Sequence, residues 1–517
     1  MSPSPIEHAA RHDPAARALV DGDRELTWSE VADLVAAIGA RLLDVAGGPG
    51  ERVAVVGENA AATLLTHVAG ICHGVGTVAT AKQLRAEEMA DQFADAGVTA
   101  VVTGPAGLTA SVDAARRLGL RTVVVHGTPA PAGVVGWRDW LAAAVGAGST
   151  ASNASGRPVA VPMVYTSGTT GRARGTEVRW AARTLTTAGE YVAELAAGNG
   201  YPAGPHLVCG PLQHNGPLTA VRHLIAGQPV VVLPGFEAEK ALRAIDTYRV
   251  TSAMMVPTHF QRLLALPEPL RQRYELGSLR LVVHTGSACR SEVKTAMIEW
   301  FGPVFVEAYG ASEIGTIARI DSHEWLAHPG SVGRACAPFE ILILDEQGHP
   351  VPAGEPGRIA VRAPEQHGVR YHADPAKTAE ATVAPGVYAL GDVGRLDADG
   401  YLYITGRESD MVISGGVNLY PAESEQVLGR QPGVAEVAVI GVPHPDLGEA
   451  LLALVLAEGG EPPDLDELDR ACRAAIAGYK CPKAYELVTD LPRNAMGKIE
   501  KRRLRERYWS GERTIAG

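Results

Sequence analysis

The sequence predicts an α/β protein built from several domains. A β-branched run at 52–56 is followed by Gly57 and by an apolar helical segment to about Val75. This order of strand, turn and helix is typical of a parallel α/β sheet, and it recurs at 98–103 and 121–126. A length of 517 residues favours about three domains, since one domain usually holds about 100 to 200 residues.

The segment 27–46 is expected to be the first long helix. Thr27 and Glu30 stand at capping-box spacing, and apolar residues recur behind them at helical intervals. A stretch of small and polar residues at 146–158 is expected to be an exposed loop. Strand and helix patterns resume from about 160 to 320, which predicts a second α/β subdomain.

After about residue 330 the pattern changes to short strands separated by Gly, Pro and Asp turns, which indicates a small β-rich subdomain. Beyond Asp410 the chain returns to mixed helices and strands. The predicted organisation is an N-terminal domain over 1–409, with subdomains at about 1–160, 160–330 and 330–409, and a C-terminal domain over 410–517.

The composition excludes several classes of protein. A net charge of −11 gives no electrostatic footprint for nucleic acid. No stretch approaches the roughly 20 apolar residues of a membrane-spanning helix, and the first residues lack the apolar core of a secretion signal. The six cysteines are scattered without a C-x-x-C pair, so free thiols are expected rather than disulfides or a zinc site. The cytoplasm is the predicted location.

The strongest local signal is a glycine-rich loop at 165–175, directly after the apolar run 159–164. Its glycines let backbone N–H groups approach an anion without a Cβ in the way, and its hydroxyls and arginines add donors and charge. A triphosphate suits this loop best, and a surface loop is the alternative. The candidate phosphate-binding residues are Thr166, Ser167, Gly168, Thr169, Thr170, Gly171 and Arg174.

This loop resembles the phosphate-loop motif of the adenylate-forming superfamily, which includes acyl-CoA synthetases, peptide-synthetase adenylation domains and luciferases. Four further segments resemble the superfamily's other motifs and occur in the same order. They are 309–313 (Y-G-x-[ST]-E), 388–392 (Y-x-T-G-D), 406–421 (hinge and following loop) and 492–498 (P-[KR]-x-x-x-G-K). The resemblance covers about residues 25 to 505.

The resemblance implies an AMP-forming acyl-CoA synthetase. A carboxylic acid attacks the α-phosphate of ATP, pyrophosphate leaves, and coenzyme A then displaces AMP from the acyl-adenylate. ATP, Mg²⁺ and coenzyme A are therefore the expected cofactors. The resemblance also implies that the β-rich subdomain is barrel-like, and that a mobile α+β C-terminal domain swings about a hinge at Asp410.

The same resemblance assigns roles around the reacting atoms. Lys498 is similar to the superfamily's mobile lysine, which would bridge carboxylate and α-phosphate oxygens. Glu313 would hold Mg²⁺, and Ser312 would donate to the phosphate or the acyl carbonyl. His214, in a looser motif match at 211–216, would lie near the reacting carboxyl group; a buried structural histidine is the alternative.

The nucleotide and the pantetheine arm have their own expected residues. Asp392 and Arg407 would hold the ribose, and Tyr309 would pack on the adenine. The remaining expected cofactor contacts are Gly286, Ala308 and Gly310 for the nucleotide, and Gly415 and Gly416 for pantetheine. The predicted acyl pocket holds His284, Ala311 and Gly315, and its small residues favour a bulky or ring-containing acid. No basic residue is plainly placed there, which disfavours a dicarboxylic acid.

Three departures from the superfamily pattern concern ATP. Arg174 stands where a lysine is usual, Glu177 follows it, and Leu390 replaces a threonine. A carboxylate at 177 would repel phosphate or divert an arginine. These departures motivate the hypothesis that adenylation is weak and that the enzyme thioesterifies a preformed acyl-adenylate, although full ATP-dependent ligation is the default expectation.

Other functions remain open at this point. The acceptor could be a freestanding carrier protein in place of coenzyme A, and a homodimer is a candidate assembly. A non-catalytic nucleotide-binding protein is disfavoured by the retained Lys498, Glu313 and Asp392. A luciferase-like oxygenase would need the same first half-reaction.

Overall fold

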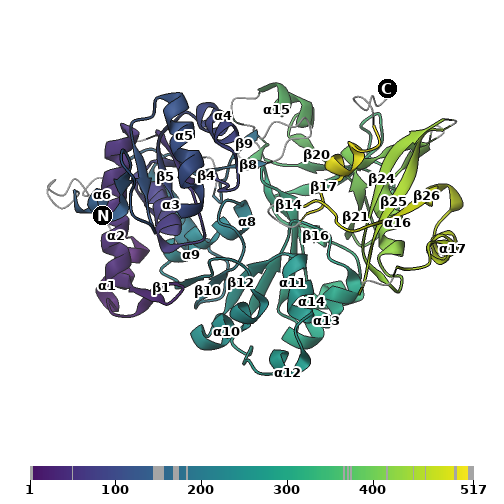
Figure 1. The fold of residues 1–517 in the computed structure, drawn as a ribbon, viewed down its shortest axis with the longest axis horizontal. Coiled ribbons are helices and arrows are strands. Elements are labelled where there is room, and N and C mark those ends of the chain that lie inside the picture. The colour runs from purple at the N-terminus through teal and green to yellow at the C-terminus, as the bar shows by residue number, and fades with distance from the viewer. Residues whose placement is uncertain are drawn as a thin grey trace.

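The computed structural model describes most of the chain. The described residues are 4–48, 50–143, 156–166, 174–181, 184–364, 367–369, 372, 375–414, 417–445, 447–459, 462–493 and 498–509. Two large α/β sheets and two smaller sheets form the described architecture. In Figure 1 the first large sheet lies at the upper left, the second runs through the centre and bottom, and the C-terminal sheet forms the right-hand side.

The first large sheet has seven strands in the order β7-β6-β5-β3-β4-β8-β9, and all neighbours are parallel except β8 and β9. Its strands are β3 (Arg52–Val56), β4 (Gly76–Thr80), β5 (Val98–Thr103), β6 (Val123–Val125), β7 (Val135–Gly136), β8 (Pro162–Thr166) and β9 (Arg174–Glu177). All of β4 is buried, as expected for a parallel strand covered on both faces.

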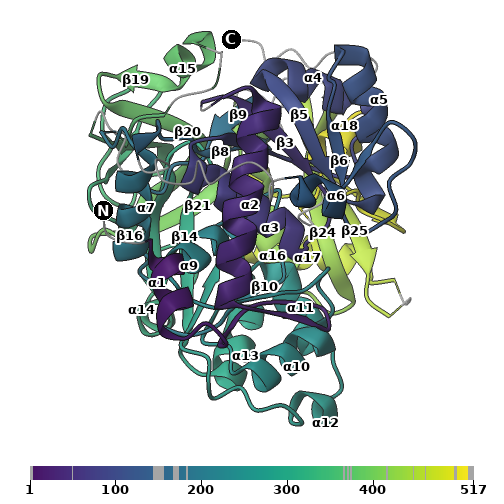
Figure 2. The ribbon, with the colours of Figure 1, turned by 90° about the vertical axis from the view of Figure 1, so that its left-hand side faces the viewer.

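Helices cover this sheet. They are α2 (Trp28–Ala46), α3 (Ala61–His73), α4 (Ala86–Ala96), η1 (Pro105–Gly107), α5 (Leu108–Leu118) and α6 (Trp137–Ala142). The capping box predicted for the first long helix is present, because Thr27 and Glu30 each bond the other's backbone N–H. Figure 2 shows α2 running along the face turned to the viewer.

The second large sheet has nine strands in the order β16-β15-β14-β13-β12-β10-β11-β1-β2. Its strands are β1 (Arg17–Asp21), β2 (Arg24–Thr27), β10 (His206–Val208), β11 (Val230–Val232), β12 (Ser252–Met255), β13 (Leu281–His284), β14 (Phe305–Ala311), β15 (Gly315–Asp321) and β16 (Arg334–Ala335). The run from β14 to β1 is parallel.

Most helices around the second sheet come from residues 188–327, and one comes from the N-terminus. They are α1 (Pro5–His12), α7 (Ala188–Ala197), α8 (Asn215–Leu218), α9 (Ala220–Ile225), α10 (Ala238–Tyr248), α11 (Pro257–Leu264), α12 (Glu268–Arg271), α13 (Ser291–Phe301) and α14 (Ser322–Ala327).

The two large sheets exchange strands across the boundary expected near residue 160. The N-terminal hairpin β1–β2 joins the second sheet, because Leu19 and Val20 pair with Val230 and Val231 of β11. Conversely, β8 joins the first sheet beside β4. One apolar core therefore contains side chains of both sheets, and α3 is buried along most of its length between them.

The third sheet matches the expected β-rich subdomain. It is antiparallel and contains β17 (Glu340–Leu344), β18 (Gly357–Arg362), β19 (Thr382–Ala384), β20 (Val387–Leu396) and β21 (Leu402–Arg407), with α15 (Pro375–Ala381) beside it. A short 3-10 turn, η4 (Glu408–Asp410), leads out of β21 into the next sheet.

The C-terminal sheet is mixed and carries its own helices. It contains β22 (Val412–Ser414), β23 (Val417–Leu419), β24 (Val434–His444), β25 (Gly448–Ala457) and β26 (Ala484–Val488), with α16 (Pro421–Leu428), α17 (Leu465–Ala475), η5 (Gly478–Lys480) and α18 (Lys501–Arg505). All six cysteines are free, as expected from their spacing. In the described part of the chain, no helix combines the length and apolarity that crossing a membrane requires.

Candidate active site

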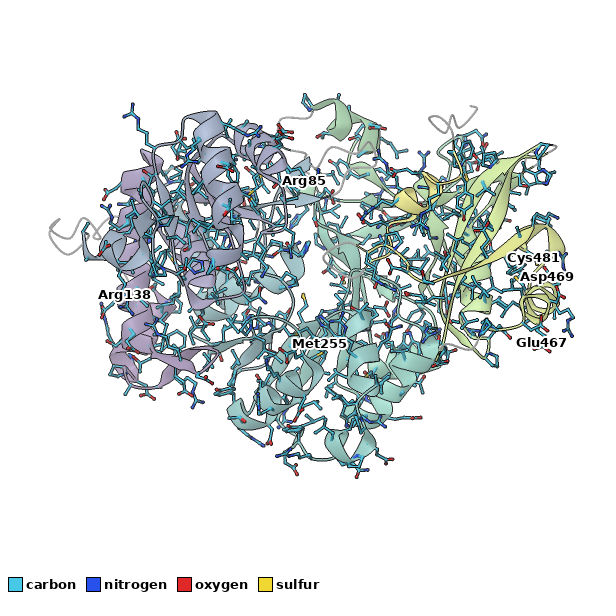
Figure 3. All side chains as sticks on the ribbon, in the orientation of Figure 1. Arg85, Arg138, Met255, Glu467, Asp469 and Cys481 are labelled. Carbon is cyan, nitrogen blue, oxygen red and sulfur yellow. The ribbon has the colours of Figure 1, made fainter. Side chains whose placement is uncertain are left out.

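A cavity of about 1280 Å³ lies at the carboxyl ends of the parallel strands of the nine-stranded sheet. Strand β12 ends at Met255, a lining residue that Figure 3 labels near the centre of the molecule. The segments that follow β10 and β13 contribute His214 and Gly286, and β8 of the other large sheet contributes Val164 and Tyr165. Ligands of open α/β sheets bind at this edge, so the cavity is the candidate active site.

Several residues singled out from the sequence line this cavity. They are His214, Gly286, Ala308, Gly310, Ala311, Ser312 and Gly315. Gly310 has a local structural reason as well, because a Cβ there would lie 1.9 Å from the carbonyl oxygen of Gly315. A side chain at position 310 would therefore separate β14 from β15 and deform this wall of the cavity.

The expectation that His284 faces the acyl pocket is wrong. Leu281 and Val283 of β13 line the cavity, and His284 points to the opposite face because side chains alternate along a strand. The His284 side chain is fully buried and meets the ring of Phe260 edge-on. Burial and the nearby charge of Lys294 hold the pKa of His284 far below its usual range, so the imidazole is neutral.

A polar cluster lies on the other face of β14, next to the cavity. The hydroxyl of Tyr309 donates to Asp392 over 2.8 Å, and Nε of Arg407 lies 3.1 Å from the same carboxylate. Asp392 and Arg407 are direct partners across β20 and β21, which fixes their spacing. Asp392 is only 8% exposed, so the carboxylate is a fixed acceptor at the edge of the cavity.

Lys498 reaches this cluster from the far end of the chain. Burial and the positive charge of Arg407 lower the pKa of its ammonium, Asp392 and Asp410 oppose this by favouring the charged form, and the resulting pKa is about 8. Asp410 is in turn held by Arg505, whose Nη1 lies 3.3 Å from its carboxylate. The structure therefore brings Tyr309, Asp392, Arg407, Asp410 and Lys498 into one electrostatic environment.

His214 offers an unused polar atom to the cavity. It precedes α8, and its Nε2 is buried without a hydrogen-bond partner among the described residues. Burial lowers the pKa of His214 to about 4, so the ring is neutral near pH 7. A neutral imidazole with an unsatisfied nitrogen can accept or donate one hydrogen bond to a bound substrate.

Ser312 lines the cavity, and Glu313 follows it in the turn between β14 and β15. No group of three or more His, Cys, Asp or Glu side chains within the described ranges could enclose a metal ion. Mg²⁺ usually takes one or two carboxylates and completes its shell with water and substrate phosphates. A single glutamate at the cavity edge fits that mode of binding.

Part of the predicted nucleotide site falls outside the described residues. This applies to Ser167, Gly168, Thr169, Thr170 and Gly171 of the phosphate loop and to Gly415 and Gly416. The backbones of Thr166 and Arg174, the described residues on either side of the loop, pair with each other where β8 and β9 run antiparallel.

The expectation that Glu177 disturbs phosphate binding is corrected by its pairing. Glu177 accepts a hydrogen bond from Nη2 of Arg52 on β3 over 2.9 Å. It lies at the end of β9 remote from the loop, opposite Met163. Arg52 thus neutralises this carboxylate inside the seven-stranded sheet.

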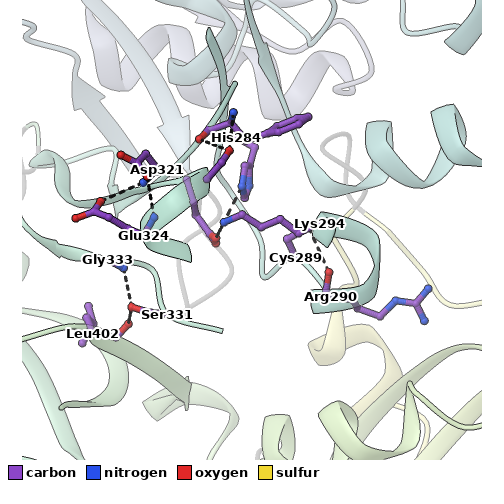
Figure 4. A network of polar contacts seen from close by, with 12 residues as sticks. His284, Cys289, Arg290, Lys294, Asp321, Glu324, Ser331, Gly333 and Leu402 are labelled. Atoms are coloured by element: carbon purple, nitrogen blue, oxygen red, sulfur yellow. Dashed lines mark hydrogen bonds and ion pairs between the residues drawn. The ribbon is translucent and has the colours of Figure 1, made fainter. Parts of the chain in front are cut away.

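A buried ion pair joins α13 to β14, and Figure 4 labels its lysine, Lys294. Nζ of Lys294 on α13 is 2.6 Å from Oε2 of Glu307, and the exposed fractions of the two side chains are 1% and 9%. Lys294 also lies over the ring of Trp325, at 4.6 Å from its centroid. Burial raises the pKa of Glu307, and Lys294 opposes this by favouring the carboxylate.

Sequence reasoning missed other residues of the cavity wall. Arg222 on α9 lines the cavity, which corrects the expectation that no basic residue is placed there. Arg222 and His223 interrupt the otherwise apolar run 220–225, and this was the available signal. Cys336 also lines the cavity, and burial raises the pKa of its thiol.

Two family models match the chain. The model described as AMP-binding enzyme matches residues 6–369, and the model described as AMP-binding enzyme C-terminal domain matches residues 423–498. Together the two matches span most of the sequence.

Curated relatives are similar along nearly the whole chain. A feruloyl-CoA synthase of Amycolatopsis is 32% identical, and the match covers 96% of this chain and 97% of the relative. A 3-[(3aS,4S,7aS)-7a-methyl-1,5-dioxo-octahydro-1H-inden-4-yl]propanoyl:CoA ligase of Mycobacterium tuberculosis is 34% identical, with 98% of both chains covered.

Solved structures agree with the fold. The amide bond synthetase McbA of Marinactinospora thermotolerans has a TM-score of 0.82 at 26% identity, covering 98% of this chain and 100% of its own. ATP-bound MatB of Rhodopseudomonas palustris has a TM-score of 0.81 at 27% identity, covering 98% and 99%. The large N-terminal and small C-terminal α/β architecture is thereby confirmed, and use of ATP and coenzyme A is supported. The chain therefore belongs to the AMP-binding enzyme family, within the adenylate-forming superfamily, and is an AMP-forming acid–thiol ligase.

Proposed function

We propose that this protein is an acyl-CoA synthetase that activates a bulky, ring-bearing carboxylic acid. The observation that carries the proposal is the large cavity beside the cluster of Asp392, Arg407 and Lys498. The two full-length relatives named above act on ring-bearing acids, as their names state. A large ring fits a wall whose sequence-predicted residues are mostly glycine and alanine.

In the first half-reaction, a carboxylate oxygen of the acid forms a bond to the α-phosphorus of ATP and pyrophosphate leaves with the electrons of the broken bond. Asp392 and Arg407 would hold the ribose, and the phosphate loop would hold the β- and γ-phosphates. Glu313 would bind Mg²⁺, whose charge offsets that of the phosphates when it is bound. Ser312 would donate to the α-phosphate or the acyl carbonyl, and His214 would orient the carboxylate through its unpartnered nitrogen.

Lys498 would contact both reacting anions. The attack brings a carboxylate toward a phosphate, and an ammonium between them stabilises the charge that gathers in the transition state. Its position near Asp392 and Arg407 supports this role, because these residues mark the expected ribose site.

In the second half-reaction, the sulfur of coenzyme A attacks the acyl carbonyl and AMP leaves. Gly415 and Gly416 would leave room for the pantetheine arm, and Asp410 would be the hinge. Two contacts join α13 to the segment after α16: Arg290 donates to the carbonyl of Gly429 over 2.9 Å, and Arg430 lies 3.2 Å from Glu292. A rotation about Asp410 would break both contacts.

The proposal is tested by acid-dependent ATP–pyrophosphate exchange over a panel of acids. Ring-bearing acids such as ferulate and indole-3-acetate are expected to support exchange better than acetate or malonate. A preference for acetate or malonate would refute the bulky substrate. Absence of exchange, combined with thioester formation from a synthetic acyl-adenylate, would instead favour the enzyme with weak adenylation. The pairing of Glu177 with Arg52 removes one reason for that alternative.

The acceptor is tested by offering one nucleophile at a time to the acyl-adenylate. Coenzyme A is expected to be consumed fastest, as in the relatives named as CoA ligases. A pantetheinylated carrier protein and a primary amine are the other arms, the latter because McbA is an amide bond synthetase. A carrier protein as acceptor, a homodimer and a cytoplasmic location stay predictions.

Asp392→Asn is expected to raise the KM for ATP by about 10- to 100-fold, because hydrogen bonds to a charged group contribute about 1.5–3 kcal/mol. Tyr309 and Arg407 would keep their places around a neutral amide of the same size. The matched control is Asp397→Asn, whose carboxylate receives backbone N–H groups in the turn after the same strand. An unchanged KM in a folded Asp392→Asn enzyme would exclude a ribose contact.

The rate of adenylation is expected to fall as pH rises above about 8. The pKa of Lys498 lies below its usual value of 10.5, at about 8, so the ammonium is present below this pH and is lost above it. The pH profile of kcat/KM reports the free enzyme, in which this pKa applies. Lys498→Arg should move the alkaline limb upward, since a guanidinium stays charged. A limb that remains near pH 8 in this variant would assign it to another group.

A further inference from the structure

One wall of the cavity is polar although the helix behind it is buried. Arg222 is the one residue of α9 that is not buried, and it lines the cavity with Asn199, Tyr201 and Thr219. We use the term polar wall for these four residues. The part of the lining that comes from β14 and the start of β15, from Ala308 to Gly315, carries mostly small side chains.

The guanidinium of Arg222 is only partly satisfied. Its Nη2 donates to the carbonyls of Gly198 and Asn199, at 2.5 and 3.3 Å, just beyond the end of α7. Its Nε is buried and has no hydrogen-bond partner among the described residues. No carboxylate in the described part of the chain forms an ion pair with Arg222, whereas Arg334 of the same cavity pairs with Glu324 over 3.0 Å. A buried donor without a partner is costly, so this guanidinium is a place for a ligand.

Asn199 gives an independent indication of a ligand. The residue is 9% exposed, it lines the cavity, and its side-chain oxygen is buried without a partner among the described residues. Because an amide can present either its oxygen or its NH₂ group after a flip, Asn199 can bond a ligand oxygen or a ligand hydroxyl. Two unpartnered polar groups therefore sit together on the polar wall.

The polar wall is separate from the predicted place of the reacting carboxylate. Lys498 lies near Asp392, Arg407 and Asp410, none of which lines the cavity, whereas Arg222 does. A substrate whose carboxylate reaches Lys498 would therefore present a different part of its structure to Arg222. The unmet guanidinium favours an acceptor oxygen on that part.

We propose that Arg222, assisted by Asn199, selects carboxylic acids that carry a second oxygen acceptor, either a ketone or a second carboxylate, apart from the reacting carboxyl group. This inference rests on the proposed acyl-CoA synthetase function and names its substrate class. The guanidinium of Arg222 donates to the second acceptor, and the amide of Asn199 adds a hydrogen bond beside it. An acid with only carbon at that position would leave both groups buried and unpaired, which is why it would be discriminated against.

The test compares matched acids. The probes are 3-(4-oxocyclohexyl)propanoate and 3-(4-carboxycyclohexyl)propanoate, each against 3-cyclohexylpropanoate, which lacks the second acceptor. The kcat/KM of pyrophosphate release is expected to be about 10- to 100-fold higher for at least one oxygenated acid, because a hydrogen bond to a charged group contributes a factor of about that size. The two oxygenated probes separate a ketone from a carboxylate as the source of the acceptor.

Arg222→Gln should lower kcat/KM for the oxygenated acids by more than it lowers kcat/KM for 3-cyclohexylpropanoate, so that most of the preference is lost. Arg222 also holds the carbonyls beyond α7, so a purely structural role would lower the rates of all three acids together. The matched control is Arg280→Gln, because Arg280 also donates to two backbone carbonyls but does not line the cavity. Arg280→Gln is expected to keep the full preference, and thermal unfolding of each variant reports any loss of stability.

The outcomes are distinguishable. Equal rates for the three acids in the wild-type enzyme, or a preference that survives Arg222→Gln, would overturn the role of Arg222 and leave the proposed synthetase intact. Failure of every acid, oxygenated or plain, in an enzyme that activates aromatic acids would also overturn it. If no acid of any kind supports pyrophosphate release, it is the proposed function that fails.

Discussion

Lys498→Ala is expected to reduce acid-dependent ATP–pyrophosphate exchange by about 1000-fold, because it removes a preorganised charge from the transition state of the first half-reaction. Lys498 lies near Asp392, Arg407 and Asp410, and burial lowers its pKa to about 8. The loss should appear mainly in kcat, since the ammonium acts where two anions meet and contributes less to ATP binding. Exchange is measured with the best acid of the panel.

The same variant should still make thioester when a synthetic acyl-adenylate and coenzyme A are supplied. The phosphorus–oxygen bond is already formed in that substrate, so Lys498 has no charge to stabilise there. Lys480→Ala is the control, because Lys480 belongs to the same C-terminal domain but pairs with Glu423 over 2.6 Å. Equal loss of both half-reactions in Lys498→Ala would show that the residue supports the fold or the domain pose instead.

Lys294→Met should lower the free energy of unfolding by about 3 to 5 kcal/mol, which is the usual cost of leaving a buried charge without its partner. Lys294 is 1% exposed, and its removal leaves Glu307 with no cation at 2.6 Å. Urea denaturation measures the change. Since Glu307 precedes Tyr309 by two residues on β14, the variant should also weaken nucleotide binding.

The double variant Lys294→Met/Glu307→Gln should recover most of the lost stability, because no unpaired carboxylate remains. The matched exposed pair is Lys240 and Glu237, also 2.6 Å apart, with exposed fractions of 49% and 64%. Lys240→Met is expected to change stability by less than about 1 kcal/mol, since solvent screens such pairs. A loss in Lys294→Met as small as that in Lys240→Met would mean that water or another group replaces the ammonium.

Local patterns in the sequence predicted much of the fold. The capping box of Thr27 and Glu30 identified α2, because both partners lie within one helical turn. The predicted approach of Asp392, Arg407 and Lys498 came from motifs in a known order, and the structure brings these residues together.

The errors arose where distant segments meet. The hairpin β1–β2 joins β11, about 200 residues further along, and no pattern in the sequence near either strand predicts that pairing. Glu177 pairs with Arg52 across 125 positions of sequence, so its effect on phosphate was misjudged. The prediction for His284 was wrong for a different reason. A shift of one residue along a strand moves a side chain to the other face of the sheet, and a motif match does not determine which face a residue occupies. Arg222 was missed because it lies outside the motifs from which the site residues were predicted.

Cys336 has a chemical consequence for an enzyme that makes activated acyl groups. An acyl-adenylate is a mixed anhydride, and the thiolate of any nearby cysteine would attack it. Cys336 lines the cavity, but burial raises the pKa of its thiol and keeps the sulfur protonated, which makes it a poor nucleophile. An acyl-adenylate bound in this cavity would therefore meet a sulfur that attacks it slowly, and the acyl group would stay available to the thiol that arrives from solution.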